Sequence, residues 1–219
     1  MNNNFCNKVS ISGVVCEELK FSHEVYGEKF YNTSLKVARL SNSFDILPIT
    51  VSERLSELSL DVGQEITVKG QFRSYNKVEL GRSRLMLTVF VREISQIDKS
   101  INSNEIELSG FICKPPIFRT TPFMREICDC LLAVNRAYNK SDYIPCIAWG
   151  RNARFIKYLA TGQQISLLGR IQSREYQKKL SETEVETRIA YEVSIGKIAL
   201  NTFDISSKDE KITFDYDLQ

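Results

Sequence analysis

The stretch Leu131-Leu-Ala-Val-Asn-Arg-Ala-Tyr-Asn-Lys-Ser-Asp-Tyr-Ile-Pro-Cys-Ile-Ala-Trp-Gly150 decides the fold of this chain. Two apolar runs, residues 131–136 and 143–149, have the length and composition of β-strands. The polar residues 139–141 between them are typical of a flexible turn, so the stretch predicts a β-hairpin.

Aromatic side chains lie next to cations at the edges of this hairpin. Tyr138 stands between Arg136 and Lys140, and Trp149 comes just before Arg151. A surface that stacks flat bases and also neutralises a phosphate backbone needs this mixture of side chains. Aromatic residues are enriched in strands in general, so a hairpin whose aromatics face a core is the alternative at any single position.

The hairpin belongs to the second copy of an internal duplication. Residues 104–110, Asn-Glu-Ile-Glu-Leu-Ser-Gly, repeat the alternation of residues 7–13, Asn-Lys-Val-Ser-Ile-Ser-Gly, 97 positions later. Such alternation is typical of a half-buried strand. Further matched pairs are Cys16 and Cys113, Phe21 and Phe118, Arg39 and Arg136, Asp45 and Asp142, Pro48 and Pro145, and, after a two-residue slip, Gly70 and Gly169, and Ser74 and Ser173. Two copies of this size are one domain apiece rather than a solenoid.

Each copy has the layout of five short strands with one short helix between the third and the fourth. Strands are expected at residues 7–13, 31–37, 44–51, 65–72 and 85–93, and again at 104–110, 128–134, 143–149, 164–171 and 188–195, with helices at 52–60 and 152–159. This layout predicts an all-β fold of two tandem, five-stranded OB-fold barrels. A generic small β-barrel or sandwich is the alternative.

Three regions of the chain are expected to differ in role. Residues 1–100 would form a divergent first OB-fold, residues 101–200 a second one, and residues 201–219 a short acidic tail. Residues 101–200 carry 14 Lys and Arg against 10 Asp and Glu. The modest positive excess therefore falls in the half that contains the aromatic hairpin.

Composition limits the classes of function that need consideration. With 42% hydrophobic and 26% charged residues, the chain is typical of a soluble globular protein. No apolar run approaches the roughly 20 residues of a membrane helix, and the N-terminus does not resemble a signal peptide. A cytoplasmic, nucleoid-associated protein is expected.

Catalytic and metal-binding patterns are not prominent in the sequence. The six cysteines form no C-x-x-C motif and there is a single histidine, so neither a metal site nor a cofactor is expected. No Ser/His/Asp, Cys/His or paired-carboxylate arrangement stands out, nor does a glycine-rich phosphate loop. The sequence therefore predicts a protein that is not an enzyme.

Five motifs follow one another in the second copy: Phe118-Arg119-x-x-Pro122, Leu132-Ala-Val-Asn-Arg136, Asp142-Tyr-Ile-Pro-Cys-Ile-Ala-Trp-Gly-Arg151, Phe155-x-x-Tyr-Leu-x-x-Gly162 and Leu168-Gly-Arg-Ile-Gln-Ser-Arg174. Through these motifs, residues 104–198 resemble the bacterial single-stranded DNA-binding protein family. The run is long and in the right order, so the resemblance is specific. Residues 7–97 resemble the family far more faintly, mainly through the duplication, which makes this a tandem two-OB-fold form.

The resemblance implies a site for single-stranded DNA. It carries the four aromatic positions of the family onto Tyr138, Tyr143, Trp149 and Tyr176. The cations placed to follow phosphates are Arg119, Arg136, Lys140, Arg151, Arg154, Lys157, Arg170, Arg174 and Lys178. The implied function is sequence-independent binding and protection of single-stranded DNA in replication, recombination or repair. RNA stays an alternative ligand, since stacking on bare bases serves both.

Partners are also implied by the resemblance. Family members with one barrel per chain commonly assemble four barrels, so two barrels per chain imply a homodimer. Replication or repair proteins are possible further partners. The tail is short and ends Asp215-Tyr-Asp-Leu-Gln219, without the Pro-Phe tip by which many family members recruit such proteins.

The first copy departs from the pattern at the aromatic positions. Ser41, Ile46, Ser52 and Lys77 replace the four aromatics of the second copy. Each stacked base contributes about 1–3 kcal/mol, so the first copy is expected to bind DNA weakly by this route. A protein–protein adaptor of a replication, plasmid or phage machine, with the barrels as docking surfaces, is therefore the alternative function.

Overall fold

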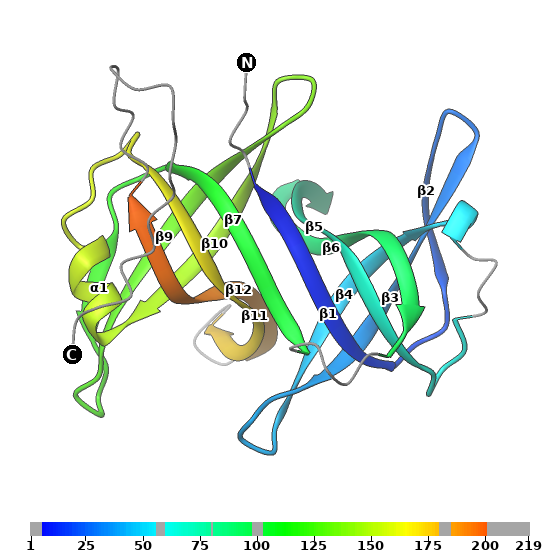
Figure 1. Ribbon diagram of the computed structural model, residues 1–219, viewed down its shortest axis with the longest axis horizontal. Coiled ribbons are helices and arrows are strands. Elements are labelled where there is room, and N and C mark those ends of the chain that lie inside the picture. Colours follow the sequence, from blue (N-terminus) through cyan, green and yellow to red (C-terminus); the bar gives the residue numbers. More distant parts are fainter. Residues whose placement is uncertain (1–5, 56–59, 80, 98–102, 180–184, 201–219) are drawn as a thin grey trace. The chain divides into compact units, whose positions relative to one another are not determined.

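The computed structural model describes residues 6–55, 60–79, 81–97, 103–179 and 185–200. The expected acidic tail, residues 201–219, lies outside the described residues. The strands are β1 (Asn7–Val15), β2 (Lys20–Val25), β3 (Glu28–Ala38), β4 (Phe44–Ser52), β5 (Glu65–Glu79), β6 (Arg82–Gln96), β7 (Asn104–Ile112), β8 (Ile117–Thr120), β9 (Glu126–Arg136), β10 (Lys140–Trp149), β11 (Gln164–Lys179) and β12 (Val185–Leu200), as Figure 1 shows. The helices are a 3-10 turn, η1 (Glu53–Leu55), and α1 (Gly150–Ile156).

The chain forms two compact units, and each takes residues from both copies. The first unit contains the described parts of residues 9–105 and 171–192. The second unit contains the described residues 6–8, 106–170 and 193–200. The outer halves of β11 and β12 therefore belong to the first unit, although they continue strands that begin or end in the second.

In the first copy the strands close on themselves. β1 pairs antiparallel with both β3 and β5, β3 pairs with β4, and β5 pairs with β6. A parallel pairing between β4 and β6, at Ile49 opposite Val89, completes the ring. This order, with parallel pairing of the third and last main strands, is that of the OB-fold.

The second copy closes in the same way. β7 pairs with β9 and β11, β9 pairs with β10, and β10 pairs parallel with β12 at Cys146 opposite Val193. β11 and β12 are neighbours in the sheet. The predicted all-β class and the two tandem five-stranded OB-folds are confirmed.

Two features of the fold differ from the prediction. In each copy a short extra strand, β2 or β8, pairs with the strand that follows it and forms a hairpin arm. The helix expected at residues 152–159 is α1, but in the first copy the described part of residues 52–60 forms only the 3-10 turn η1.

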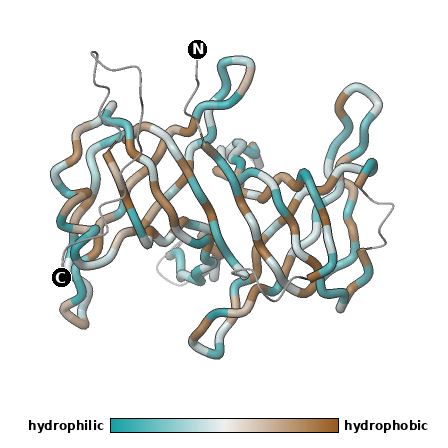
Figure 2. The backbone as a smooth tube through the Cα atoms, in the orientation of Figure 1, coloured by the Kyte–Doolittle hydropathy of each residue, from teal (hydrophilic) through white to brown (hydrophobic). Residues whose placement is uncertain are grey.

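The core follows the period-two pattern that the strands predict. Along β10, Asp142, Ile144, Cys146 and Ala148 are buried, and near the end of the strand Ile147 is buried as well. Hydrophobic and hydrophilic residues are interspersed along the strands in Figure 2. Cys146 is a free thiol, as are the buried Cys128 and Cys130. Burial raises the pKa of the Cys128 thiol to about 11, so this thiol stays protonated at neutral pH and packs as a small hydrophobic group.

Glycine is needed where neighbouring strands approach most closely. A Cβ atom on Gly70 would lie 2.2 Å from the carbonyl oxygen of Phe90, and one on Gly169 would lie 2.4 Å from that of Ser194. Only a residue without a side chain fits such a contact with backbone. The match of Gly70 with Gly169 in the duplication therefore reflects a packing requirement shared by both barrels.

Candidate nucleic-acid interface

The outward-facing side chains of β9 and β10 form a surface that we call the β9–β10 face. Because successive side chains of a strand point to opposite sides, the burial of Asp142, Ile144 and Cys146 directs Tyr143 and Trp149 outward. Tyr143 is 44% exposed and Trp149 is 40% exposed. They are six positions apart, which corresponds to roughly 20 Å along the strand.

Tyr138 lies at the turn that connects β9 to β10. It has a backbone φ of 62°, and the next residue, Asn139, has a φ of 53°. A bulky residue in this left-handed region is strained, and the Tyr138 side chain gains no burial in return, because it is 93% exposed. Backbone strain without a packing benefit is typical of functional positions.

Two of the predicted cations of the second unit are held near the β9–β10 face by acidic partners. The Arg119 Nε donates to a carboxylate oxygen of Asp129 at 2.8 Å, and the Arg154 Nε donates to Glu126 at 2.6 Å. Both arginine side chains remain well exposed. These ion pairs orient the two guanidinium groups, each of which has five N–H donors.

Arg136 lies in a different environment from the other predicted cations. Its Nε is 3.5 Å from a carboxylate oxygen of Asp142, a residue whose side chain is fully buried. The matched pair in the first unit, Arg39 and Asp45, makes the same ion pair. Because the pair occurs in both copies, including the one without the aromatics, we assign Arg136 to the fold.

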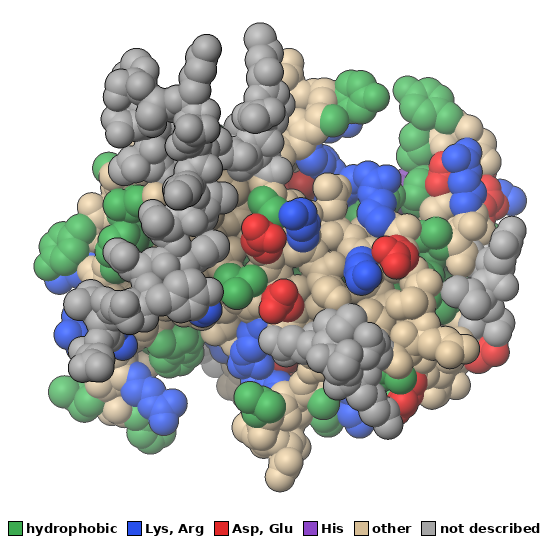
Figure 3. Space-filling model, viewed as in Figure 1, with side chains coloured by type: hydrophobic (Ala, Val, Ile, Leu, Met, Phe, Trp, Pro, Cys, Tyr) green, Lys and Arg blue, Asp and Glu red, His purple; other side chains and the backbone are tan. Residues whose placement is uncertain are grey.

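The remaining predicted cations of the second unit vary in exposure. Lys140, Arg151 and Lys157 are exposed, and Arg170 is half-buried. The Lys157 ammonium lies 4.8 Å from the ring centroid of Phe118. On the face drawn in Figure 3, basic, acidic and hydrophobic side chains are intermixed, which agrees with the small net charge of +2.

Tyr176, Arg174 and Lys178 belong to the first unit. They lie on the outer half of β11, beyond residue 170. The Arg174 guanidinium lies 5.9 Å from the ring centroid of Tyr176 and 3.6 Å from a carboxylate oxygen of Glu192. The predicted set is therefore divided, with Tyr138, Tyr143 and Trp149 in the second unit and Tyr176 in the first.

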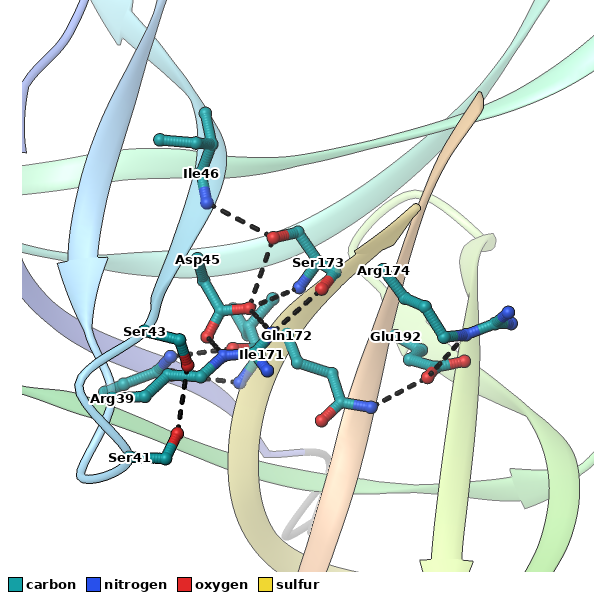
Figure 4. A network of polar contacts seen from close by, with 11 residues as sticks. Arg39, Ser41, Ser43, Asp45, Ile46, Ile171, Gln172, Ser173, Arg174 and Glu192 are labelled. Atoms are coloured by element: carbon teal, nitrogen blue, oxygen red, sulfur yellow. Dashed lines mark hydrogen bonds and ion pairs between the residues drawn. The ribbon is translucent and has the colours of Figure 1, made fainter. Parts of the chain in front are cut away.

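The first unit uses the matched positions for internal contacts. Figure 4 shows Asp45 beside Arg39 and Ser173, and the Ile46 N–H donates to the Ser173 hydroxyl at 3.2 Å. Ser52, in place of Trp149, donates to Glu28. The pKa of Arg39 is raised, chiefly because its guanidinium donates a hydrogen bond to Asp45.

Exposed residues at the tip of the β8–β9 hairpin were missed by the sequence analysis. Phe123 and Met124 are strongly exposed, and Met124 has a φ of 57°. They follow Pro122, and two apolar residues after a proline in a polar turn are the signal that could have indicated them.

The described part of the chain offers little for metal binding or membrane insertion. Among the described residues, no three His, Cys, Asp or Glu side chains are grouped so that they could hold a metal ion. Within the same residues, neither helix has the length and apolar character to cross a membrane.

Comparison with known proteins identifies the family of the chain. The model of the single-strand binding protein family matches residues 103–198. A Streptococcus pyogenes protein named single-stranded DNA-binding protein 1 is 30% identical over 96 residues, which are 41% of this chain and 74% of that protein. The chain belongs to the single-strand binding protein family.

Other members of the single-strand binding protein family match over shorter parts. The single-stranded DNA-binding protein of Clostridium tetani is 34% identical over 83 residues, 35% of this chain. The chain spans 57% of the length of that protein and 50% of single-stranded DNA-binding protein 1 of Staphylococcus aureus.

A solved structure of a single-strand binding protein shares the fold of most of this chain. The wild-type single-stranded DNA-binding protein of Thermus aquaticus superimposes with a TM-score of 0.71 at 18% identity, covering 90% of this chain and 94% of that one. Because this coverage exceeds the family match at residues 103–198, the likeness extends to the first copy. The resemblance seen in the sequence is confirmed, and the family is a non-enzymatic one.

Proposed function

We propose that the protein binds single-stranded DNA without sequence preference and protects it during replication, recombination or repair in the cytoplasm. The observation that carries this proposal is the pair Tyr143 and Trp149, exposed on one face of β10 beside the strained, exposed Tyr138. The strand 2–3 face of an OB-fold, here β9 and β10, is the surface on which this fold binds oligonucleotides.

The chemistry of the face suits bases and phosphates together. Aromatic rings stack on any base, so binding does not depend on sequence. Arg119, Arg151 and Arg154 supply guanidinium groups at the end of the face that contains Trp149, and Lys140 supplies an ammonium group at the Tyr138 end. In this proposal Lys157 and Arg170 are peripheral contacts, Arg136 supports the fold, and Tyr176, Arg174 and Lys178 form a separate contact in the first unit.

The single tryptophan allows a direct test, because Trp149 is the only indole in the chain. Oligo(dT) should quench its fluorescence at saturation, and the dissociation constant should rise steeply with salt. Each phosphate neutralised adds about 0.7 to the magnitude of the log–log slope, so three to five contacts predict a slope of roughly −2 to −3.5. Duplex DNA of equal length should bind more weakly, and an RNA oligonucleotide tests the second ligand. Absence of both quenching and salt dependence would refute the proposed face.

Assembly into a homodimer is part of the proposal. Two barrels per chain would then give four per particle, the number that family members with one barrel commonly reach. Light scattering at micromolar concentration should give about twice the chain mass of 25.1 kDa. A mass of one chain at that concentration would contradict the dimer.

The adaptor alternative has one observation in its favour. The β2–β3 hairpin of the first unit exposes Phe21, Val25 and Tyr26, and Tyr26 is strained at a φ of 50°. Exposed apolar groups of this kind are typical of protein docking surfaces. The titration above discriminates the two functions, since the adaptor predicts weak binding of single-stranded DNA by the whole protein.

A further inference from the structure

A pocket of about 520 Å³ opens in the second unit beside the β9–β10 face. It lies between the tip of the β8–β9 hairpin and the start of α1, and its lining includes Met124, Arg125, Glu126, Trp149 and Arg154. Its volume falls within the range of sites that hold small ligands. Of these residues, the sequence analysis selected only Trp149 and Arg154.

The lining combines two surfaces that suit a nucleobase. Trp149 belongs to the β9–β10 face and also lines the pocket, and it is 40% exposed. Met124 is 82% exposed at the hairpin tip, in a strained backbone conformation. A polarisable thioether makes favourable contacts with aromatic rings, so a base that stacks on Trp149 can also be covered by Met124.

Two arginines and one glutamate line the pocket, so its charges do not cancel. The Arg154 Nε is tied to Glu126 at 2.6 Å, so this pair is close to neutral as a unit. Arg125 is the second cation of the lining, and it adds a net positive charge to the pocket. That charge favours an anionic ligand, and a guanidinium matches the geometry of a phosphate group.

We propose that this pocket holds one nucleotide, at an end of the single-stranded DNA that is bound on the β9–β10 face. The base lies between Trp149 and Met124, and its phosphate is held by Arg125. This inference rests on the proposed function. It adds that the bound DNA leaves the β9–β10 face beyond Trp149, where the last base of the DNA enters the pocket.

The test is a double-mutant cycle between the pocket and the ligand. Fluorescently labelled oligo(dT) of fixed length is compared with two versions that lack the base of the first or the last nucleotide, in wild type and in Met124→Ala. In the wild type, one of the two abasic ends should weaken binding roughly tenfold. In Met124→Ala the same abasic end should cost much less, because the base and its cover interact directly.

A charge-matched pair of variants tests the phosphate contact. Arg125→Ala should weaken oligo(dT) binding several-fold and reduce the magnitude of the salt slope by about 0.7. Lys114→Ala removes the same charge from an exposed residue of the second unit outside the pocket and should change neither quantity. Circular dichroism on each variant verifies that the fold is intact.

The outcomes separate the two proposals. If wild type does not bind oligo(dT) at all, the proposed function fails, and the pocket proposal fails with it. If wild type binds tightly but both abasic ends cost the same in wild type and in Met124→Ala, and Arg125→Ala behaves as Lys114→Ala does, only the nucleotide pocket is overturned. If an acidic peptide quenches Trp149 and competes with oligo(dT) in wild type but not in Arg125→Ala, while the abasic ends show no coupling, the pocket is a peptide site.

Discussion

Replacing Tyr143 and Trp149 together by alanine is expected to weaken binding of single-stranded DNA by about 2–6 kcal/mol, at least roughly 30-fold in the dissociation constant. Each ring can stack on one base, and the two residues lie about 20 Å apart along β10. The two losses should therefore add with little coupling. Because this variant lacks the tryptophan signal, the measurement is fluorescence anisotropy of a labelled oligo(dT).

The matched control for this experiment is Tyr158→Ala. Tyr158 is a strongly exposed aromatic residue of the same unit, but it follows α1 and is not part of the β9–β10 face. Loss of the Tyr158 ring should leave the affinity for oligo(dT) nearly unchanged. If Tyr158→Ala costs as much as the double variant, or if the double variant binds as wild type does, stacking on the β9–β10 face is not the source of affinity.

Replacing Asp45 by alanine is expected to lower the free energy of unfolding by about 3 kcal/mol or more. Asp45 is fully buried and accepts hydrogen bonds from the Arg39 Nε at 2.8 Å and from the Ser173 backbone N–H at 2.7 Å. The variant removes the carboxylate partner of a partly buried guanidinium, which keeps only its bond to the Ser173 carbonyl oxygen, and leaves the Ser173 N–H without Asp45. Such a loss costs more than the interaction itself contributes. Urea denaturation followed by circular dichroism measures the change.

An exposed ion pair of the first unit provides the comparison. The Lys69 ammonium lies 3.6 Å from a carboxylate oxygen of Glu93, and both side chains are about half exposed. Glu93→Ala should cost below about 1 kcal/mol, because solvent screens such pairs. An Asp45→Ala variant as stable as Glu93→Ala would mean that the Arg39–Asp45–Ser173 network does not stabilise the first unit.

Much of the architecture could be predicted because the strand pattern occurs in two copies. The 97-residue offset located the main strands of both copies, and the family resemblance selected Tyr143 and Trp149, which are exposed. The hairpin arms that contain β2 and β8 were missed because their short strands are mostly exposed, so they have no buried face and no alternation to reveal them.

The candidate site was predicted less completely, for two physical reasons. Tyr176 was grouped with the other aromatics by the family resemblance, and a sequence does not tell how far a hairpin extends. β11 and β12 are each 16 residues long, and their outer halves pack into the first unit. Arg136 was assigned to phosphate because its ion pair with Asp142 depends on a contact across the hairpin. The retention of Arg39 and Asp45 in the first copy was the available clue.

The contribution of residues 171–192 to the first unit has a consequence for synthesis of the protein. A ribosome that has made residue 105 has produced only the N-terminal segment of that unit, without the Ser173 that binds Asp45. At roughly 5–20 residues per second, translation from residue 105 to residue 192 takes about 4–17 seconds. During this interval Asp45 can pair with Arg39 but lacks the Ser173 N–H that completes its hydrogen bonds, so the first unit is complete only after residue 192 has been made.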